Sequence, residues 1–212
     1  MLKFYHTPYS RSSSIFWLLE ELGQPYEMEV LDIRAPGGAP ESYRDVQPNK
    51  KVPAVVHDGT VITERAAITI YLADAFPEAG LAPSADAADR APYLTMLVYC
   101  DAVLDPAVAA KAQGLSYGSN NYSFGLFEDM VRYLEKILSE RRFAAGDRFT
   151  AADTQIGSAI NFTMSIAKVL PERPAFTAYL GRVVDRPAYR KVAARDAELI
   201  KTVTPLPQFQ QK

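Results

Sequence analysis

The first third of the chain alternates short apolar runs with turn residues. Residues 2–6 alternate loosely between apolar and polar side chains, which predicts a short strand. Apolar residues at helical spacing then predict a helix from Ser12 to Leu22, ended by Gly23 and Pro25. A second strand is expected over Glu29–Ile33. This part of the sequence therefore indicates a β-α-β unit.

A hairpin and a helix follow a loop rich in proline and glycine. Two β-branched runs within Val52–Ile62 flank Asp58-Gly59, a dipeptide typical of tight hairpin turns. Thr63 is placed to cap the next helix, which is expected to run through Phe76 with Glu64 in its first turn. The order β-α-β, loop, β-β-α is that of a thioredoxin-like domain.

The second half of the chain has helical periodicity. Apolar residues between Phe127 and Leu138 recur three and four positions apart, which predicts an amphipathic helix. Thr150 and Asp153 have the spacing of a capping box and predict the start of another helix. A last helix is expected over about Phe176–Ile200.

Proline placement divides the chain into two domains. Residues 77–89 have the composition of a linker, and no proline occurs between Ala107 and Leu170, a stretch that permits long helices. The predicted fold is therefore an α/β thioredoxin-like N-terminal domain over residues 1–78, followed by an all-α helical domain over residues 88–205.

Composition and charge exclude several function classes. The chain has 212 residues with 23 Lys+Arg against 25 Asp+Glu, so its net charge of −2 provides no general attraction to nucleic acid or to an anionic membrane. Cys100 is the one cysteine, which excludes an intrachain disulfide and, with two histidines, a zinc site of common spacing. No targeting segment and no apolar run of membrane-spanning length is recognised, so a cytoplasmic protein is expected.

Most motifs that carry chemistry are absent. The sequence contains no G-x-S-x-G, no phosphate-binding glycine loop, no G-x-G-x-x-G and no C-x-x-C. His6 and His57 are expected to be ordinary strand residues, and Cys100 an inert core residue. The turn over residues 7–12 does place several hydroxyl groups at the start of a helix, where backbone N–H groups favour an anion, although these hydroxyls could equally serve only as helix caps.

Several motifs in order resemble the glutathione transferase superfamily, in its bacterial Ser-type branch. They are L-K-F-Y-H-T-P-Y-S-R-S, I-F-W-L-L-E-E-L-G, P-N-K-K-V-P-A-V-V-H-D-G, I-T-E-R-A-A-I-T-I-Y-L, F-T-A-A-D and R-P-A-Y-R. Each is weakly specific alone, but together they extend from Met1 to about Ala197. The resemblance implies the same two-domain fold, glutathione as co-substrate and a homodimer.

The resemblance also implies residues that bind glutathione. Pro53 corresponds to the family's cis-proline, beside which the Val52 backbone would pair with the cysteinyl part of glutathione. Glu64 corresponds to the acidic residue that holds the γ-glutamyl ammonium, and the Arg65 N–H to the group that binds the γ-glutamyl carboxylate. Lys51 could contact the glycyl carboxylate. Many relatives have serine at the position of Arg65.

Three hydroxyl groups compete for the catalytic role, which is to stabilise the glutathione thiolate. Ser10 lies where Ser-type members have Ser-Arg, and it is the preferred candidate. Ser12 is its neighbour, and Tyr5 lies where Tyr-type members have a tyrosine at the end of a strand. No cysteine lies near residues 10–12, which argues against the members that act as thiol transferases.

The second substrate is expected to be a small hydrophobic electrophile bound between the domains. Tyr9 would form the floor of its site, and the helical domain offers Tyr99, Tyr117, Tyr122 and Phe124, the last three in an expected mobile loop. Two alternatives to conjugation stay open. One is a glutathione-dependent peroxidase or isomerase. The other is a non-catalytic binding module, and the unusual Arg65 is the feature that supports this alternative.

Overall fold

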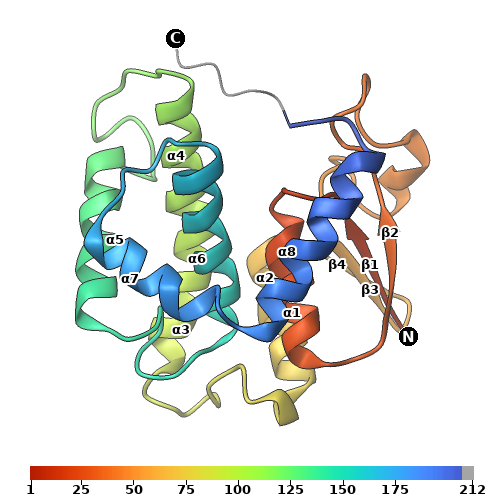
Figure 1. The fold of residues 1–212 in the computed structure, drawn as a ribbon, viewed down its shortest axis with the longest axis horizontal. Helices are drawn as coiled ribbons and strands as arrows, with labels where there is room; N and C mark the ends of the chain where they lie inside the picture. Colours follow the sequence, from red (N-terminus) through yellow and green to blue (C-terminus); the bar gives the residue numbers. More distant parts are fainter. Residues whose placement is uncertain (207–212) are drawn as a thin grey trace. The chain divides into compact units, whose positions relative to one another are not determined.

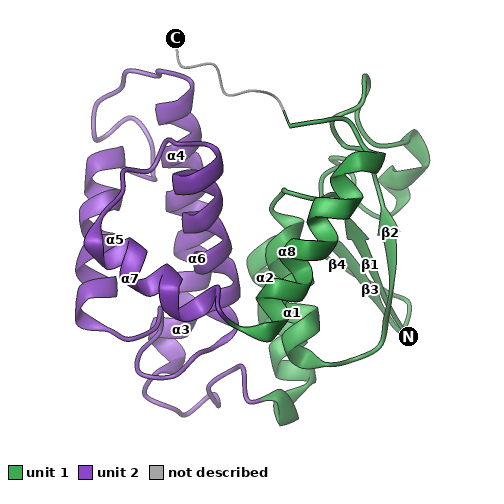
Figure 2. Cartoon of the chain, viewed as in Figure 1, with its two compact units in different colours: residues 1–79, 186–212 green, residues 80–185 purple. Residues whose placement is uncertain are grey.

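A computed structural model describes residues 1–206 and divides the chain into two compact units (Figure 2). Unit 1 contains Met1–Ala79 and the described residues 186–206, and unit 2 contains Gly80–Asp185. Unit 1 holds a four-stranded sheet, and the regular elements of unit 2 are helical, which confirms the predicted fold class. The domain limits 1–78 and 88–205 stay a prediction.

Unit 1 is built on a mixed sheet. Its strands are β1 (Leu2–His6), β2 (Tyr26–Val30), β3 (Ala54–His57) and β4 (Thr60–Thr63). They lie in the order β2-β1-β3-β4, with β1 parallel to β2 and antiparallel to β3 (Figure 1). Asp58 and Gly59 close the β3–β4 hairpin with positive φ angles of 48° and 84°, as a tight turn of this kind requires. The predicted hairpin is confirmed.

The second strand lies earlier in the sequence than expected. The parallel register pairs Tyr26 with Leu2 and Val30 with His6, so β2 ends opposite the end of β1. Beyond it the Asp32 carboxylate accepts the N–H groups of Arg34 and Ala35, each at 3.1 Å, and this local turn competes with an extended strand. The predicted range Glu29–Ile33 was therefore wrong at both ends.

Three α-helices belong to unit 1: α1 (Ser12–Leu22), α2 (Arg65–Ala75) and α8 (Pro187–Leu199). Helices α1 and α2 pack on the sheet, and α8 packs along α1 (Figure 1). Helix α1 has the predicted bounds, and Gly23 ends it with a φ of 67° while donating its N–H to the Leu19 carbonyl at 3.1 Å. Thr63 is the last residue of β4 and does not cap α2, so that expectation was wrong; Glu64 occupies the N-cap position.

Unit 2 buries its apolar residues between helices. These are α3 (Arg90–Tyr99), α4 (Asp105–Ala112), α5 (Phe127–Glu140), α6 (Ala151–Asn161) and α7 (Pro174–Val183), with π-helical segments at Cys100–Leu104 and Phe162–Ile166. The Thr150 N–H donates to the Asp153 carboxylate at 2.8 Å at the start of α6, which confirms the predicted capping box.

Proline splits the last predicted helix in two. The range Phe176–Ile200 was expected to be one helix, but α7 ends at Val183 and α8 begins at Pro187. Proline has no N–H to continue a helix and disfavours helical geometry in the preceding residue, and Arg186 is extended with φ −66° and ψ 140°. The break leaves α8 in unit 1, where it supplies a site residue.

One stretch of unit 2 qualifies the expectation that no segment could span a membrane. The continuous helix Arg90–Ala112 is long and apolar enough to do so by length and composition. Core helices meet the same criteria, and Tyr93, Met96 and Leu97 on this helix are fully buried within the protein. These three side chains are thus part of the packing of unit 2, whereas Val98 on the same helix is exposed.

Candidate functional site

The turn between β1 and α1 is organised by hydroxyl groups. The Thr7 hydroxyl donates to the Leu31 carbonyl at 2.5 Å, and the Thr7 N–H donates to Ser12 Oγ at 3.1 Å. Tyr9, half-buried, takes a positive φ of 52°. Ser10 Oγ accepts the Ser12 N–H at 3.1 Å, so its oxygen caps one of the backbone donors that begin α1.

Ser10 and Ser12 lie in direct contact. Their Oγ atoms are 2.7 Å apart, and Ser10 Oγ also lies 2.7 Å from the Thr7 carbonyl oxygen. Ser12 is completely buried, whereas Ser10 is partly exposed. Ser12 is therefore closed to a ligand outside the turn, whereas Ser10 has part of its surface open to one.

The structure separates Tyr5 from the two serines. Tyr5 belongs to a cluster that includes Leu31, Tyr43 and Ala54, and its ring centroid lies 5.1 Å from that of Tyr43. Successive strand side chains point to opposite faces, and the neighbouring His6 faces Phe16 of α1 at a ring separation of 5.3 Å. The Tyr5 side chain thus lies on the face of the sheet away from α1.

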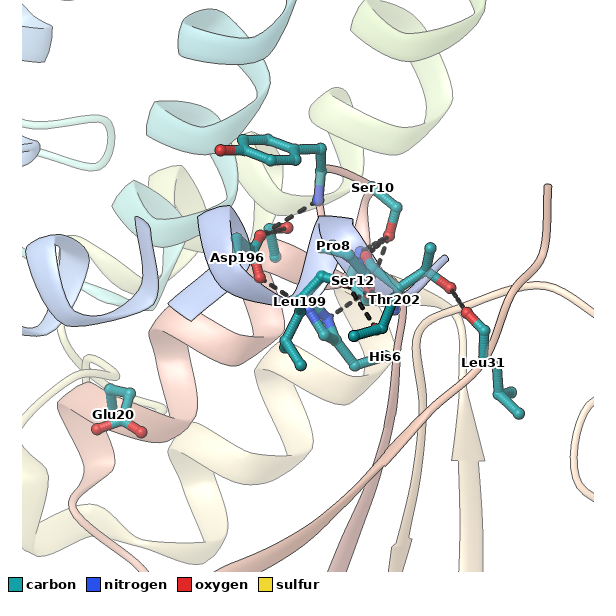
Figure 3. Close-up of polar contacts among 12 residues, drawn as sticks. His6, Pro8, Ser10, Ser12, Glu20, Leu31, Asp196, Leu199 and Thr202 are labelled. Atoms are coloured by element: carbon teal, nitrogen blue, oxygen red, sulfur yellow. Dashed lines mark hydrogen bonds and ion pairs between the residues drawn. The ribbon is translucent and has the colours of Figure 1, made fainter. Parts of the chain in front are cut away.

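Sequence reasoning missed two residues of this site. They are His6, at the end of β1, and Asp196, in α8. His6 is fully buried, and its Nδ1 lies 2.9 Å from Ser12 Oγ while its Nε2 lies 2.8 Å from Asp196 Oδ1 (Figure 3). Asp196 Oδ2 accepts the Ser13 hydroxyl at 2.5 Å and the Tyr9 N–H at 3.2 Å. The available signal was an acidic residue in the buried stripe of a helix: α8 buries Val192, Asp196 and Leu199.

A guanidinium group supports the same turn. Arg34 donates from Nη2 to the Pro8 carbonyl at 3.1 Å and from Nε to the Thr204 carbonyl at 2.9 Å. Partial burial lowers the pKa of Arg34, and the negative charges of Asp32 and Asp196 oppose that shift. Within residues 1–206, no three His, Cys, Asp or Glu side chains lie close enough to hold a metal ion.

The predicted Lys51–Pro53 segment precedes β3. The Val52–Pro53 peptide bond is cis, as the resemblance implied. Lys51 is exposed, its N–H donates to Gln47 Oε1 at 3.0 Å and its carbonyl accepts the Tyr43 hydroxyl at 3.0 Å. Val52 is buried and lies outside the register that joins β3 to β1 and β4.

Glu64 and Arg65 differ sharply in exposure. Glu64 is exposed and has φ 65° and ψ 121°, a conformation that is strained for a residue with a side chain. Its carbonyl accepts the Ile68 N–H at 2.9 Å, which is the first hydrogen bond of α2. Arg65 is only 5% exposed, so its guanidinium is a buried group of unit 1.

The aromatic residues proposed for the second substrate fall into two groups in unit 2. Tyr117, Tyr122 and Phe124 form one cluster with ring separations of 5.1–5.5 Å. Tyr99 contacts Tyr133 instead, at 4.6 Å, and burial raises the pKa of Tyr99. The structure therefore brings together three of the four residues.

Comparison with known proteins matches the chain to one family. The sequence profile described as "Glutathione S-transferase, N-terminal domain" matches residues 8–75. Glutathione S-transferase 3 of Schizosaccharomyces pombe is 30% identical over 220 residues, covering 93% of this chain and 88% of the relative.

Solved structures agree in fold over nearly the whole chain. A glutathione transferase from Methylococcus capsulatus has 26% identity and a TM-score of 0.74, covering 93% of this chain and all of its own. A sphingomonad glutathione S-transferase solved with glutathione also has 26% identity, with a TM-score of 0.75, covering 92% of this chain and 98% of its own.

Proposed function

Because the chain belongs to the glutathione transferase superfamily, we propose that it conjugates glutathione to small hydrophobic electrophiles by the chemistry of the Ser-type branch. The observation that carries the proposal is the partly exposed residue Ser10 just before the N-terminus of α1, with its hydroxyl oxygen beside the first backbone N–H of the helix. Ser12 is fully buried beside it, and the Tyr5 side chain lies on the other face of the sheet. Ser10 is therefore the candidate whose hydroxyl can meet a ligand at the turn.

A single hydroxyl is energetically sufficient for the proposed role. Lowering the pKa of a thiol from about 8.5 by about two units requires about 2.7 kcal/mol of preferential stabilisation of the thiolate. A hydrogen bond to a charged group supplies about 1.5–3 kcal/mol. The N-terminus of α1 adds about 0.3–1 kcal/mol for a nearby anion.

Glutathione would be held by the two other predicted segments. The backbone of Val52, outside the sheet register, is proposed to pair with the cysteinyl part. The exposed carboxylate of Glu64 is proposed to bind the γ-glutamyl ammonium, and the Arg65 N–H the γ-glutamyl carboxylate. The exposed Lys51 would then be available for the glycyl carboxylate.

The test is Ser10→Ala, with Ser14→Ala as the matched control. Ser14 lies nearby in the first turn of α1, but its hydroxyl donates to the Arg11 carbonyl at 2.9 Å. Ser10→Ala should raise the pKa of the bound glutathione thiol by about 1–2 units, read from thiolate absorbance, and lower conjugation to chlorodinitrobenzene about 10–100-fold. Glutathione affinity measured by calorimetry should change little, and Ser14→Ala should leave all three quantities unchanged.

Other outcomes would contradict the proposal. If Ser10→Ala leaves the thiol pKa unchanged while Tyr5→Phe raises it, the Ser-type assignment is wrong. Binding with a thiolate but turnover only of hydroperoxides would indicate the peroxidase alternative, and binding without any turnover would indicate a non-catalytic module. We further propose a cytoplasmic homodimer with a detoxifying role, and light scattering of the purified protein tests the dimer.

A further inference from the structure

The buried chain Asp196–His6–Ser12–Ser10 has a defined pattern of donors and acceptors. Asp196 faces three potential donors, His6 Nε2, the Ser13 hydroxyl and the Tyr9 N–H, which suits an ionised carboxylate that only accepts. This assigns the proton of a neutral His6 to Nε2 and leaves Nδ1 as an acceptor. Ser12 Oγ lies 2.9 Å from this Nδ1 and 3.1 Å from the Thr7 carbonyl oxygen, and the shorter distance favours donation of its proton to Nδ1.

The same reasoning defines the direction of the two serine hydroxyls. Ser12 Oγ has two lone pairs, and the Thr7 N–H fills one of them at 3.1 Å. The single Ser10 hydroxyl proton has two acceptors at 2.7 Å, the Thr7 carbonyl oxygen and the second lone pair of Ser12 Oγ, and the relay uses the orientation toward Ser12. The chain therefore runs from the partly exposed Ser10 inward to His6, and its open acceptor end is the buried imidazole.

We infer that this chain is a proton relay, through which His6 takes up the thiol proton of glutathione. The inference rests on the proposed function of Ser10. As the thiol proton moves to Ser10 Oγ, the Ser10 proton moves to Ser12 Oγ and the Ser12 proton moves to His6 Nδ1. Three bonds to hydrogen break and three form, which leaves a thiolate and an imidazolium with no change in net charge.

At the end of the relay the four side chains are paired with one another and with the thiolate, while the Thr7 carbonyl oxygen no longer accepts a serine proton. The imidazolium donates to both Asp196 and Ser12, Ser12 donates to Ser10, and the Ser10 hydroxyl is directed at the thiolate. Ser12 Oγ then accepts from the Thr7 N–H and from His6 Nδ1, while Ser10 Oγ accepts the Ser12 N–H and the Ser12 hydroxyl. Both lone pairs of each oxygen are used, so the reversed chain stabilises the thiolate that created it.

Charged and titratable groups around His6 are few. Asp196 is its direct partner, and the rings of Phe4 and Phe16, each 5.3 Å from the imidazole, carry no titratable proton. Tyr189, Tyr9 and Arg34 act electrostatically on or beside Asp196. A paired carboxylate is thus the main compensation for a buried imidazolium.

The order Ser12–His6–Asp196 also resembles a hydrolase triad, but burial excludes that reading. A triad serine must reach the carbonyl that it attacks. Ser12 has no exposed surface and its oxygen is enclosed by His6, Thr7 and Ser10. Ser12, His6 and Asp196 are therefore positioning residues that act on the ligand through Ser10.

Nitrogen NMR of histidine tests the relay in a protein that keeps all four members. The chain has two histidines, so His57→Gln leaves His6 as the single reporter. Adding glutathione at neutral pH should shift the His6 Nδ1 signal from the unprotonated to the protonated position. S-methylglutathione has no thiol proton and should leave it unshifted. A protonated Nδ1 before glutathione is added, or no shift while thiolate absorbance develops, would overturn the relay but leave the role of Ser10 standing.

Proton release provides a second measurement. In weakly buffered indicator solution, the wild type should form thiolate with little release of protons, because His6 retains them. His6→Gln and Asp196→Asn should release close to one proton for each thiolate formed. A wild type that releases one proton per thiolate refutes the relay alone, whereas failure to bind glutathione refutes the relay and the proposed function together.

Discussion

Replacing Asp153 with alanine should remove the acceptor on which the start of α6 depends. Asp153 is fully buried in unit 2. Its Oδ1 accepts the Ala144 N–H at 2.7 Å and the Tyr179 hydroxyl at 2.9 Å, and its Oδ2 accepts the Thr150 N–H at 2.8 Å. The carboxylate therefore joins a loop, a helix start and α7.

The expected loss follows from the donors left unpaired. Asp153→Ala leaves two buried N–H groups and two buried hydroxyls, those of Tyr179 and Thr150, without this acceptor, each worth about 1–3 kcal/mol. The free energy of unfolding should fall by about 3–5 kcal/mol, allowing for partial relaxation. Asp153→Asn retains an oxygen toward Ala144 and Tyr179 but turns an NH2 group toward the Thr150 N–H, so about 1–2 kcal/mol should be lost.

The pH dependence has a definite sign. Burial raises the pKa of Asp153 to about 6, against the hydrogen bonds from Ala144, Thr150 and Tyr179, which lower it. Since the ordinary value is 3.8, the folded state binds this proton more tightly than the unfolded state. The resulting stability is complete below that ordinary value and is lost as the pH rises through about 6, a change of about 3 kcal/mol.

Urea unfolding followed by circular dichroism at several pH values measures both effects. Between about pH 4 and pH 7, the free energy of unfolding of the wild type should fall relative to that of Asp153→Asn, because the variant has no carboxyl group to titrate at this position. Asp147→Asn removes an exposed charge nearby and should stay within about 0.5 kcal/mol of the wild type. A pH-independent difference between wild type and Asp153→Asn would refute the argument from burial, and a loss below about 1 kcal/mol in Asp153→Ala would mean that the donors found other acceptors.

Two further predictions concern single positions. Glu64→Gly should relieve the strain at φ 65°, raising the free energy of unfolding by about 1 kcal/mol in urea titrations, yet weaken glutathione binding about tenfold in calorimetry. Glu64→Gln keeps the strained backbone and should weaken glutathione binding without raising the free energy of unfolding. Equal free energies of unfolding for Glu64→Gly and Glu64→Gln would show that the backbone at residue 64 is not strained. Cys100 is fully buried, so a disulfide reagent should react rapidly with its thiol only in denaturant. A rapid reaction with the folded protein would show that the helices around Cys100 open transiently.

Local signals predicted much of the fold. The bounds of α1 follow from its apolar spacing and from Gly23, which ends the helix with a positive φ. The sequence also contained the reason for two of the errors: the Asp32 turn moves the end of β2, and Pro187 separates α7 from α8. In each case a single side chain overrode an apolar pattern that continued past it.

The site was less predictable because it depends on distant packing. The hydroxyl-rich turn is local, and Ser10 and Ser12 were found from their place before a helix. The contact between His6 and Asp196 joins residues 190 positions apart, and it exists only because α8 packs along α1. Periodicity showed which positions of α8 are buried, but not which strand residue a buried carboxylate would face.

The two serines, of which the sequence favoured Ser10, have different surroundings that suit two roles. A hydroxyl that donates to a thiolate must receive a proton from elsewhere if the thiol proton is to leave through it, because it carries only one. Ser10 alone, at the surface of the turn, would pass that proton to water. With Ser12 buried 2.7 Å behind it and His6 beyond, the proposed route is internal, and Asp196 compensates the charge where the proton rests. Ser10→Ala and Ser12→Ala should therefore differ: the first removes the donor to sulfur, whereas the second leaves the donor and makes thiolate formation release its proton to solvent.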